Sequence, residues 1–136
     1  SFAEHVDPTR VAAVGYCFGG LCVLELARSG APVAGVASMH GFFDTPDPAD
    51  ARNIQGKVLV CHGHRDPLVP AEQVAAFHAE MTAAAVDWTF IHYGTAVHGF
   101  TNPGAGTDPA TGVAYHEQAD RRSWAHLTAF LGELFA

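Results

Sequence analysis

The segment Gly15-Tyr16-Cys17-Phe18-Gly19 places a thiol between two glycines, after an apolar run and before a helical pattern. Small residues two positions before and after a nucleophile allow a tight turn from strand to helix, as in the G-x-S-x-G elbow, here with Cys in place of Ser. The N–H of Phe18 would then point at a developing oxyanion. The segment predicts that Cys17 is a nucleophile. The alternative interpretation is a Gly-rich turn in which Cys17 is a small core residue.

Two later residues have the types that would activate such a thiol. Asp66 follows the apolar run Val-Leu-Val-Cys, and His98 lies in a loop with glycines on either side. A histidine takes the proton of the nucleophile, and a carboxylate orients that histidine. Asp66-Pro67 could also simply open a turn. The order nucleophile, acid, histidine is nevertheless that of the α/β-hydrolases, so we predict a catalytic triad of Cys17, Asp66 and His98.

The elements that must position these residues alternate along the chain. Apolar runs predict four strands, at Val11–Tyr16, Val33–Met39, Lys57–Cys61 and Trp88–Tyr93, and helical spacing predicts helices at Leu21–Ser29, from Pro70, and at Glu117–Phe135. Such alternation predicts an α/β fold with a parallel sheet of about four strands and flanking helices. Ligands of such sheets bind beyond the carboxyl ends of the strands. The residues that fall there are Cys17, His40, His62, His64, Asp66 and His98.

Composition restricts the class of protein. The chain has 136 residues, a net charge of −7 and 49% hydrophobic residues, which predicts one globular domain over residues 1–136. The negative charge argues against a nucleic-acid partner, and no apolar run is long enough for a membrane span. Three cysteines without metal-type spacing favour a reduced, cytoplasmic setting. Because residue 1 is Ser and not Met, an N-terminal portion could precede it.

One other motif suggests a different chemistry. His62-Gly63-His64-Arg65-Asp66 resembles a zinc-binding H-x-H-x-D core, but that signature continues with His where this chain has Pro67. We therefore expect no metal and no cofactor. The other polar and aromatic candidates are expected to be packing or surface residues: His40, His78, His92, His116 and His126 as ordinary histidines, Cys22 and Cys61 as inert core thiols, and Trp88 and Trp124 as core aromatics.

The motifs together resemble the dienelactone hydrolase family of α/β-hydrolases. The elbow GYCFGG, the segment KVLVCHGHRDPLVP, the segment AVHGFTNPG and the final RRSWAHLTAFLGELF carry this resemblance, which covers essentially the whole chain. It implies the C-terminal half of the family fold, with Cys17 as nucleophile, Asp66 as acid and His98 as base. It also implies that the family's earlier strands, its second oxyanion donor and its substrate-binding arginine lie outside this sequence.

The resemblance implies a small-molecule ester or lactone as substrate. Dienelactone-specific members carry an arginine shortly after the histidine, whereas here the next arginine after His98 is Arg121. A broader carboxylic ester or lactone hydrolase is therefore the expected function. Two alternatives stay open: a truncated half-fold that acts as a non-catalytic binding or assembly module, and a protein with a redox-sensitive thiol at Cys17.

The resemblance also bears on assembly. In the full family fold, an earlier strand pairs with the strand equivalent to Val11–Tyr16, and that neighbour is missing from this sequence. An apolar strand with an open edge promotes self-association. We therefore predict a homodimer formed through the Val11–Tyr16 edge.

Overall fold

The computed structural model describes residues 4–136 and contains one four-stranded sheet in which every strand is parallel to its neighbours. The strands follow the chain order β1-β2-β3-β4, with β1 at Ala12–Tyr16, β2 at Gly35–Met39, β3 at Lys57–Gly63 and β4 at Trp88–Tyr93. The predicted α/β fold with a four-stranded parallel sheet is confirmed. Because the strands are parallel, all four carboxyl ends lie at one edge of the sheet.

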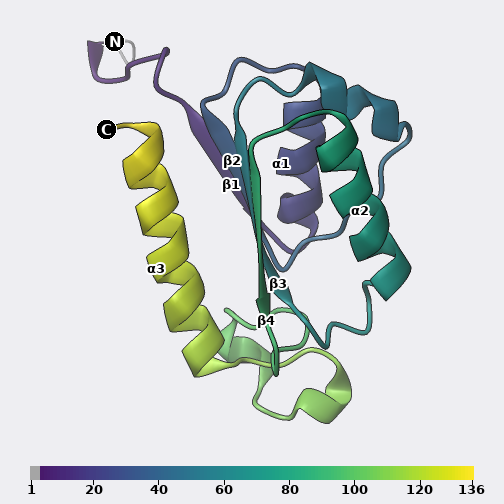
Figure 1. Ribbon diagram of the computed structural model, residues 1–136. Coiled ribbons are helices and arrows are strands. Elements are labelled where there is room, and N and C mark those ends of the chain that lie inside the picture. Colours follow the sequence, from purple (N-terminus) through teal and green to yellow (C-terminus); the bar gives the residue numbers. More distant parts are fainter. Residues whose placement is uncertain (1–3) are drawn as a thin grey trace.

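Helices cover both faces of the sheet (Figure 1). Helices α1 (Phe18–Arg28) and α2 (Ala71–Ala83) lie on one face, and α3 (Glu117–Leu134) lies on the other. Each face has its own apolar core: Leu24, Val36 and Phe77 are buried on the α1 and α2 side, and Met39 and Leu127 on the α3 side. The central strands β2 and β3 are buried on both faces, which explains their continuous apolar sequence.

The element boundaries differ from the predicted ones in two informative places. Helix α1 begins at Phe18 and not at Leu21, because the turn after β1 takes a single residue, Cys17. Strand β3 continues two residues beyond Cys61, to Gly63. Both differences bring backbone closer to the carboxyl edge of the sheet. Within residues 4–136, no helix is long and apolar enough to cross a bilayer.

A buried ion pair ties α1 to α2. The Arg28 guanidinium donates from Nε and Nη2 to the two carboxylate oxygens of Glu80, at 2.6 and 2.9 Å, and from Nη1 to Glu25 at 2.7 Å. The side chains of Arg28 and Glu80 are only 2% and 4% exposed, whereas Glu25 is 38% exposed. The bidentate geometry compensates for removing both charges from water.

Removing one partner of this pair tests its role. We expect Glu80→Ala to lower the free energy of unfolding by about 3–5 kcal/mol, because Arg28 would keep a buried charge without its main partner. Glu25→Ala, which removes the exposed partner, should cost no more than about 1 kcal/mol. Urea denaturation followed by circular dichroism measures both. Equal losses for the two variants would contradict this account.

Strand β1 lies at the edge of the sheet and is poorly covered on the α3 side. Val14 pairs with Ala37 of β2, which lies in the α3-side core, so Val14 and Tyr16 point to that face. They are 38% and 42% exposed. An edge strand with apolar, exposed side chains is a ready surface for pairing with another strand.

We expect the 136-residue chain, expressed on its own, to form a dimer at micromolar concentration in which two β1 edges pair antiparallel about a two-fold axis. Val14→Lys should give a monomer, since a charge on an edge strand opposes pairing. Leu68→Lys, at an exposed leucine that is 50% exposed beyond β3, is the matched control and should stay dimeric. Size-exclusion chromatography with light scattering gives the mass. A monomeric wild-type chain would refute the prediction.

Candidate active site

The turn after β1 forces Cys17 into an unusual backbone conformation. Its φ is 53°, in the left-handed region that residues other than glycine rarely occupy. Its N–H donates to the carbonyl of Met39 at 3.1 Å, and its carbonyl accepts from the N–H of Gly20 at 2.9 Å. Strain of this kind is typical of functional turns that hold a side chain out of the regular strand and helix geometry.

The glycines around this turn have different roles. A Cβ on Gly15 would collide with the carbonyl of Gly19, and a Cβ on Gly20 would meet the backbone of Gly41 at 2.7 Å. A Cβ on Gly19 would meet no atom within 4 Å. The expectation that Gly15 and Gly19 both provide space is therefore wrong for Gly19. Gly15 and Gly20 are the positions where a side chain would not fit.

The carboxylate of Asp66 uses both of its oxygens. Oδ1 accepts from the backbone N–H of Leu68 at 2.9 Å, and Oδ2 lies 2.7 Å from Nδ1 of His98. The Asp66 side chain is completely buried, and that of His98 nearly so. Since one oxygen is fixed by the backbone, the other presents a defined direction to the imidazole. The bond also holds the proton on Nδ1 and leaves Nε2 of His98 available.

The loop after β4 holds His98 by backbone pairing. The N–H of His98 donates to the carbonyl of Gly112 at 3.1 Å, and its carbonyl accepts from the N–H of Ala114 at 3.1 Å. A Cβ on Gly63 would meet the carbonyl of Val97 at 2.5 Å, so the end of β3 packs directly against this loop. The predicted loop that holds His98 is confirmed, and it contains two short 3₁₀ turns, at Pro103–Ala105 and Pro109–Thr111.

A second histidine lies closer to Cys17 than His98 does. His40 directly follows β2, and its Nδ1 is 3.3 Å from the sulfur of Cys17, while its Nε2 is 2.8 Å from the hydroxyl oxygen of Thr101. His40 is 2% exposed and also has a positive φ of 39°. Sγ of Cys17, one ring nitrogen of His40 and one of His98 lie within 4.8 Å of one another.

The environment keeps the thiol and His40 neutral. Burial, and then the negative charge of Asp66, raise the pKa of the Cys17 thiol. Burial, and then the neighbouring His98, lower the pKa of His40 to about 4. A neutral thiol donates to Nδ1 of His40, which places the imidazole proton on Nε2, facing the Thr101 hydroxyl. In this geometry His40 is a hydrogen-bond partner of the thiol and a poor acceptor for its proton.

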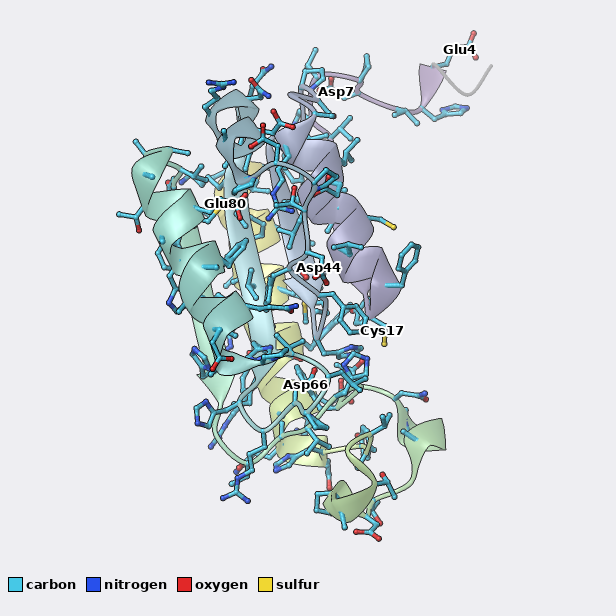
Figure 2. All side chains as sticks on the ribbon, turned by 90° about the vertical axis from the view of Figure 1, so that its right-hand side faces the viewer. Glu4, Asp7, Cys17, Asp44, Asp66 and Glu80 are labelled. Atoms are coloured by element: carbon cyan, nitrogen blue, oxygen red, sulfur yellow. The ribbon has the colours of Figure 1, made fainter. Side chains whose placement is uncertain are left out.

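The four residues predicted to carry chemistry lie at one end of the sheet. They are Cys17, Phe18, Asp66 and His98. Figure 2 shows Cys17 at the start of α1, with Asp66 at the same end of the molecule. Phe18 is the first residue of α1, so its N–H has no carbonyl acceptor within the helix. His40, expected to be a surface or packing residue, is buried and also contacts Cys17 and Thr101. Its position directly after a strand was the available signal, and it applied to His40 as well as to Asp66.

Two expectations about buried side chains are also wrong. Cys22 is exposed on α1, while Cys61 is buried as expected, and all three cysteines are free thiols. Trp124 is 60% exposed on α3, whereas Ala119, Ser123 and Leu127 of the same helix are buried. Spacing along a helix allows more than one apolar stripe, and here the stripe without Trp124 faces the sheet.

The remaining histidines form a separate group beside β3 and β4. Nδ1 of His64 is 3.4 Å from Nδ1 of His92, and the ring of His62 lies 5.5 Å from that of His92. His62 is 2% exposed, and its Nδ1 has no hydrogen-bond partner among the described residues. Burial lowers the pKa of His62 to about 4, while the negative charge of Asp66 acts in the opposite direction.

The chain matches the dienelactone hydrolase family over residues 2–135. The chain belongs to the dienelactone hydrolase family. It is 36% identical over 135 residues to the uncharacterized protein K02A2.1 of Caenorhabditis elegans, covering 96% of this chain and 84% of the worm protein. The predicted resemblance is thereby confirmed.

Two solved structures of dienelactone hydrolase-like proteins are also similar. The structure described as m3DLH is 44% identical with a TM-score of 0.90, and covers 96% of this chain. P91, a dienelactone hydrolase-like promiscuous phosphotriesterase from metagenomic libraries, is 44% identical with a TM-score of 0.86, and covers 95%. The chain spans only 55% and 54% of the lengths of these two proteins. The family that the chain matches and the two structures that it resembles are named for hydrolases.

The buried His62 makes a prediction about pH. Its pKa is about 4 in the folded chain and about 6.5 in an unfolded one, so as pH falls through 6.5 the unfolded state takes up a proton that the folded state does not. Stability should therefore decrease between those two pH values, by about 3 kcal/mol for this one residue.

His62→Phe keeps a ring beside Phe43 and Phe90 and removes the titration. We expect its unfolding free energy to fall less steeply than that of the wild type between about pH 7 and about pH 4. His5→Ala, at an exposed histidine that is not among the groups acting on His62, should keep the wild-type slope. Chemical denaturation at several pH values measures this. A slope for His62→Phe that equals the wild-type slope would exclude His62 as the source.

Proposed function

We propose that this chain carries the catalytic centre of a carboxylic ester or lactone hydrolase, with Cys17 as nucleophile, His98 as general base and Asp66 as the residue that orients His98. The observation that supports it most directly is the buried 2.7 Å contact between His98 and Asp66, a few ångströms from the Cys17 thiol. A carboxylate-bound imidazole next to a thiol on a strand-to-helix turn is suited to acyl transfer.

His98 is a better base for this reaction than His40, although His40 is nearer to the sulfur. Protonated His98 would be stabilised by the Asp66 carboxylate, whereas His40 faces a neutral hydroxyl and has a pKa of about 4. The Cys17 sulfur lies within 4.8 Å of a ring nitrogen of His98, so the side chain has little distance to move. His40 would hold the neutral thiol before substrate binds.

The reaction would proceed in two halves. The Cys17 proton passes to Nε2 of His98, and the thiolate attacks the ester carbonyl, with the oxyanion near the Phe18 N–H. Collapse of the tetrahedral intermediate transfers the proton from His98 to the departing alcohol and leaves a thioester on Cys17. Water then gives a proton to His98 and attacks the thioester, and the acid leaves as the proton returns to the thiolate.

The neutral state of Cys17 bears on the alternative of a redox-sensitive thiol. Oxidation by peroxide requires a thiolate, and burial together with Asp66 raises the pKa of Cys17. The resting site therefore disfavours that role. A half-fold with a purely binding role predicts no covalent intermediate, which separates it from the proposed hydrolase.

The catalytic proposal is tested by trapping the thioester. With p-nitrophenyl acetate, we expect release of nitrophenolate and an acetylated Cys17 peptide in mass spectrometry. Cys17→Ala and His98→Ala should abolish both, and Asp66→Asn should lower the rate by about 10⁴-fold. Cys22→Ala and His64→Ala are matched controls at exposed positions and should retain activity. Nitrophenolate release without acetyl-Cys17, or no release at all, would contradict the proposal.

The isolated chain should be a slow enzyme. Among the described residues, the Phe18 N–H is the donor that we assign to the oxyanion. An oxyanion site with one donor removed is typically slower by about 10²–10³-fold. Single-turnover acetylation is thus a more sensitive readout than steady-state hydrolysis.

The 44% identity with P91 favours a second substrate class. A phosphotriester with a p-nitrophenol leaving group would place its phosphoryl centre where the carbonyl carbon of an ester lies, and attack by Cys17 would give an S-phosphoryl intermediate. Measuring this alongside the acetate ester shows which electrophile the site prefers.

A further inference from the structure

Three soft metal-binding atoms meet at the carboxyl end of β1 and β2. The sulfur of Cys17, a nitrogen of His40 and a nitrogen of His98 lie within 4.8 Å of one another, and two of the three side chains are buried. Thiolate and imidazole are ligands that select zinc and its neighbours over magnesium or calcium. From the sequence, zinc was considered only at the H-x-H-x-D segment beginning at His62, and no metal was expected there or at Cys17.

The spacing fits tetrahedral coordination. With Zn–S near 2.3 Å and Zn–N near 2.0–2.1 Å, the sulfur and nitrogen of two adjacent ligands are about 3.5 Å apart. The distance between Sγ of Cys17 and Nδ1 of His40 is 3.3 Å. The nitrogen of His98 lies within 4.8 Å of the other two atoms, so it would need to approach them by no more than about 1.5 Å to complete tetrahedral spacing.

The outer nitrogens of both imidazoles are already held. In metal sites, each ligating histidine usually donates its other N–H to a carboxylate or another oxygen, which fixes the tautomer and the ring direction. Here Nδ1 of His98 is bonded to Asp66 and Nε2 of His40 to Thr101, at 2.7 and 2.8 Å. The lone pairs of the inner nitrogens are thus both available toward Cys17.

The geometry points to a Zn²⁺ site formed by Sγ of Cys17, Nδ1 of His40 and Nε2 of His98, with a fourth position open to water or an anion. Binding forms one Zn–S and two Zn–N bonds, and the thiol proton is released to solvent. Three protein ligands with an open fourth position distinguish such a site from a closed structural one, which has four.

The consequence for activity rests on the proposed function. The zinc ion binds the sulfur lone pair of Cys17 that would attack the ester. The same ion binds the nitrogen of His98 that would accept the proton of the Cys17 thiol. Zinc is therefore a reversible inhibitor that withholds nucleophile and base together.

Cobalt substitution tests the site without any assay of catalysis. Titration of the purified, reduced chain with Co²⁺ should give intense visible bands of tetrahedral cobalt and a near-ultraviolet thiolate-to-cobalt band, and Zn²⁺ should displace both. Cys17→Ser should lose the thiolate band, and His40→Ala should weaken binding at least about tenfold. Thr101→Val, which removes only the oxygen partner of His40, should weaken it roughly 10–100-fold. Circular dichroism of each variant checks that it is folded.

Matched controls separate this site from its two rivals. Cys22→Ser removes the other accessible thiol, and His64→Ala removes the histidine pair whose Nδ1 atoms are 3.4 Å apart. Both should keep the wild-type cobalt spectrum and affinity. Three results would each overturn the inference. The thiolate-to-cobalt band could disappear in Cys22→Ser, or the cobalt spectrum could lack that band and disappear in His64→Ala. The third is a wild-type spectrum typical of six-coordinate cobalt.

The two proposals fail separately. If one equivalent of Zn²⁺ stops acetylation of Cys17 and a chelator restores it, both hold. A cobalt spectrum with the expected variant pattern in a chain that never becomes acetylated supports the metal site and refutes the esterase. If Cys17 is still acetylated while zinc is bound, the inhibitory role is refuted. The amount of bound zinc is measured as the metal that a chelator removes from the protein.

Discussion

Parallel pairing of all four strands is the constraint from which the candidate site follows. A parallel strand can be followed only by a crossover, so the chain returns to the same end of the sheet each time before it pairs again. The residues after β1, β2, β3 and β4 are therefore brought to one edge whatever lies between them. Cys17, His40, Asp66 and His98 come from four separate segments and meet for this reason.

Close backbone packing then fixes the position of each side chain. Gly15 and Gly20 allow the turn at Cys17, and Gly63 lets the His98 loop lie against the end of β3. Burial of these side chains raises the pKa of the Cys17 thiol and lowers that of His40. Cys17 and His40 are thus kept neutral, and the Asp66 carboxylate lies where it can stabilise a positive charge on His98.

The sequence was sufficient for the order and type of the strands and for the edge at which chemistry would occur. Apolar runs predicted β2 and β3 well, because a strand that is buried on both faces is apolar at most of its positions. The sequence was insufficient for deciding which side of a helix faces the sheet. Trp124 and Cys22 each fall on a helix with apolar residues on several sides, and only packing decides which of these sides is buried.

His40 shows a second limit of sequence reasoning. His40 directly follows a strand, as a catalytic residue of this fold would. No sequence motif marks His40, however, whereas motifs mark Cys17 and Asp66. Its role depends on a 3.3 Å contact across two strands and on Thr101, some sixty positions later, and neither is visible as a spacing. Gly19 shows the reverse case: it matches the motif, yet the space beside it is open.

The agreement between strand order and chain order has a consequence during synthesis. Each new strand can join the edge of the strand made just before it, so the sheet can grow as the chain leaves the ribosome. Helices α1 and α2 emerge between strands and cover their face early. Helix α3 follows all four strands, so the face that carries Met39 and Leu59 stays open to solvent until that helix is released. A nascent chain paused before residue 117 has one sheet face covered by helices and one apolar face exposed to solvent. A chaperone that recognises exposed apolar surface can bind during this interval.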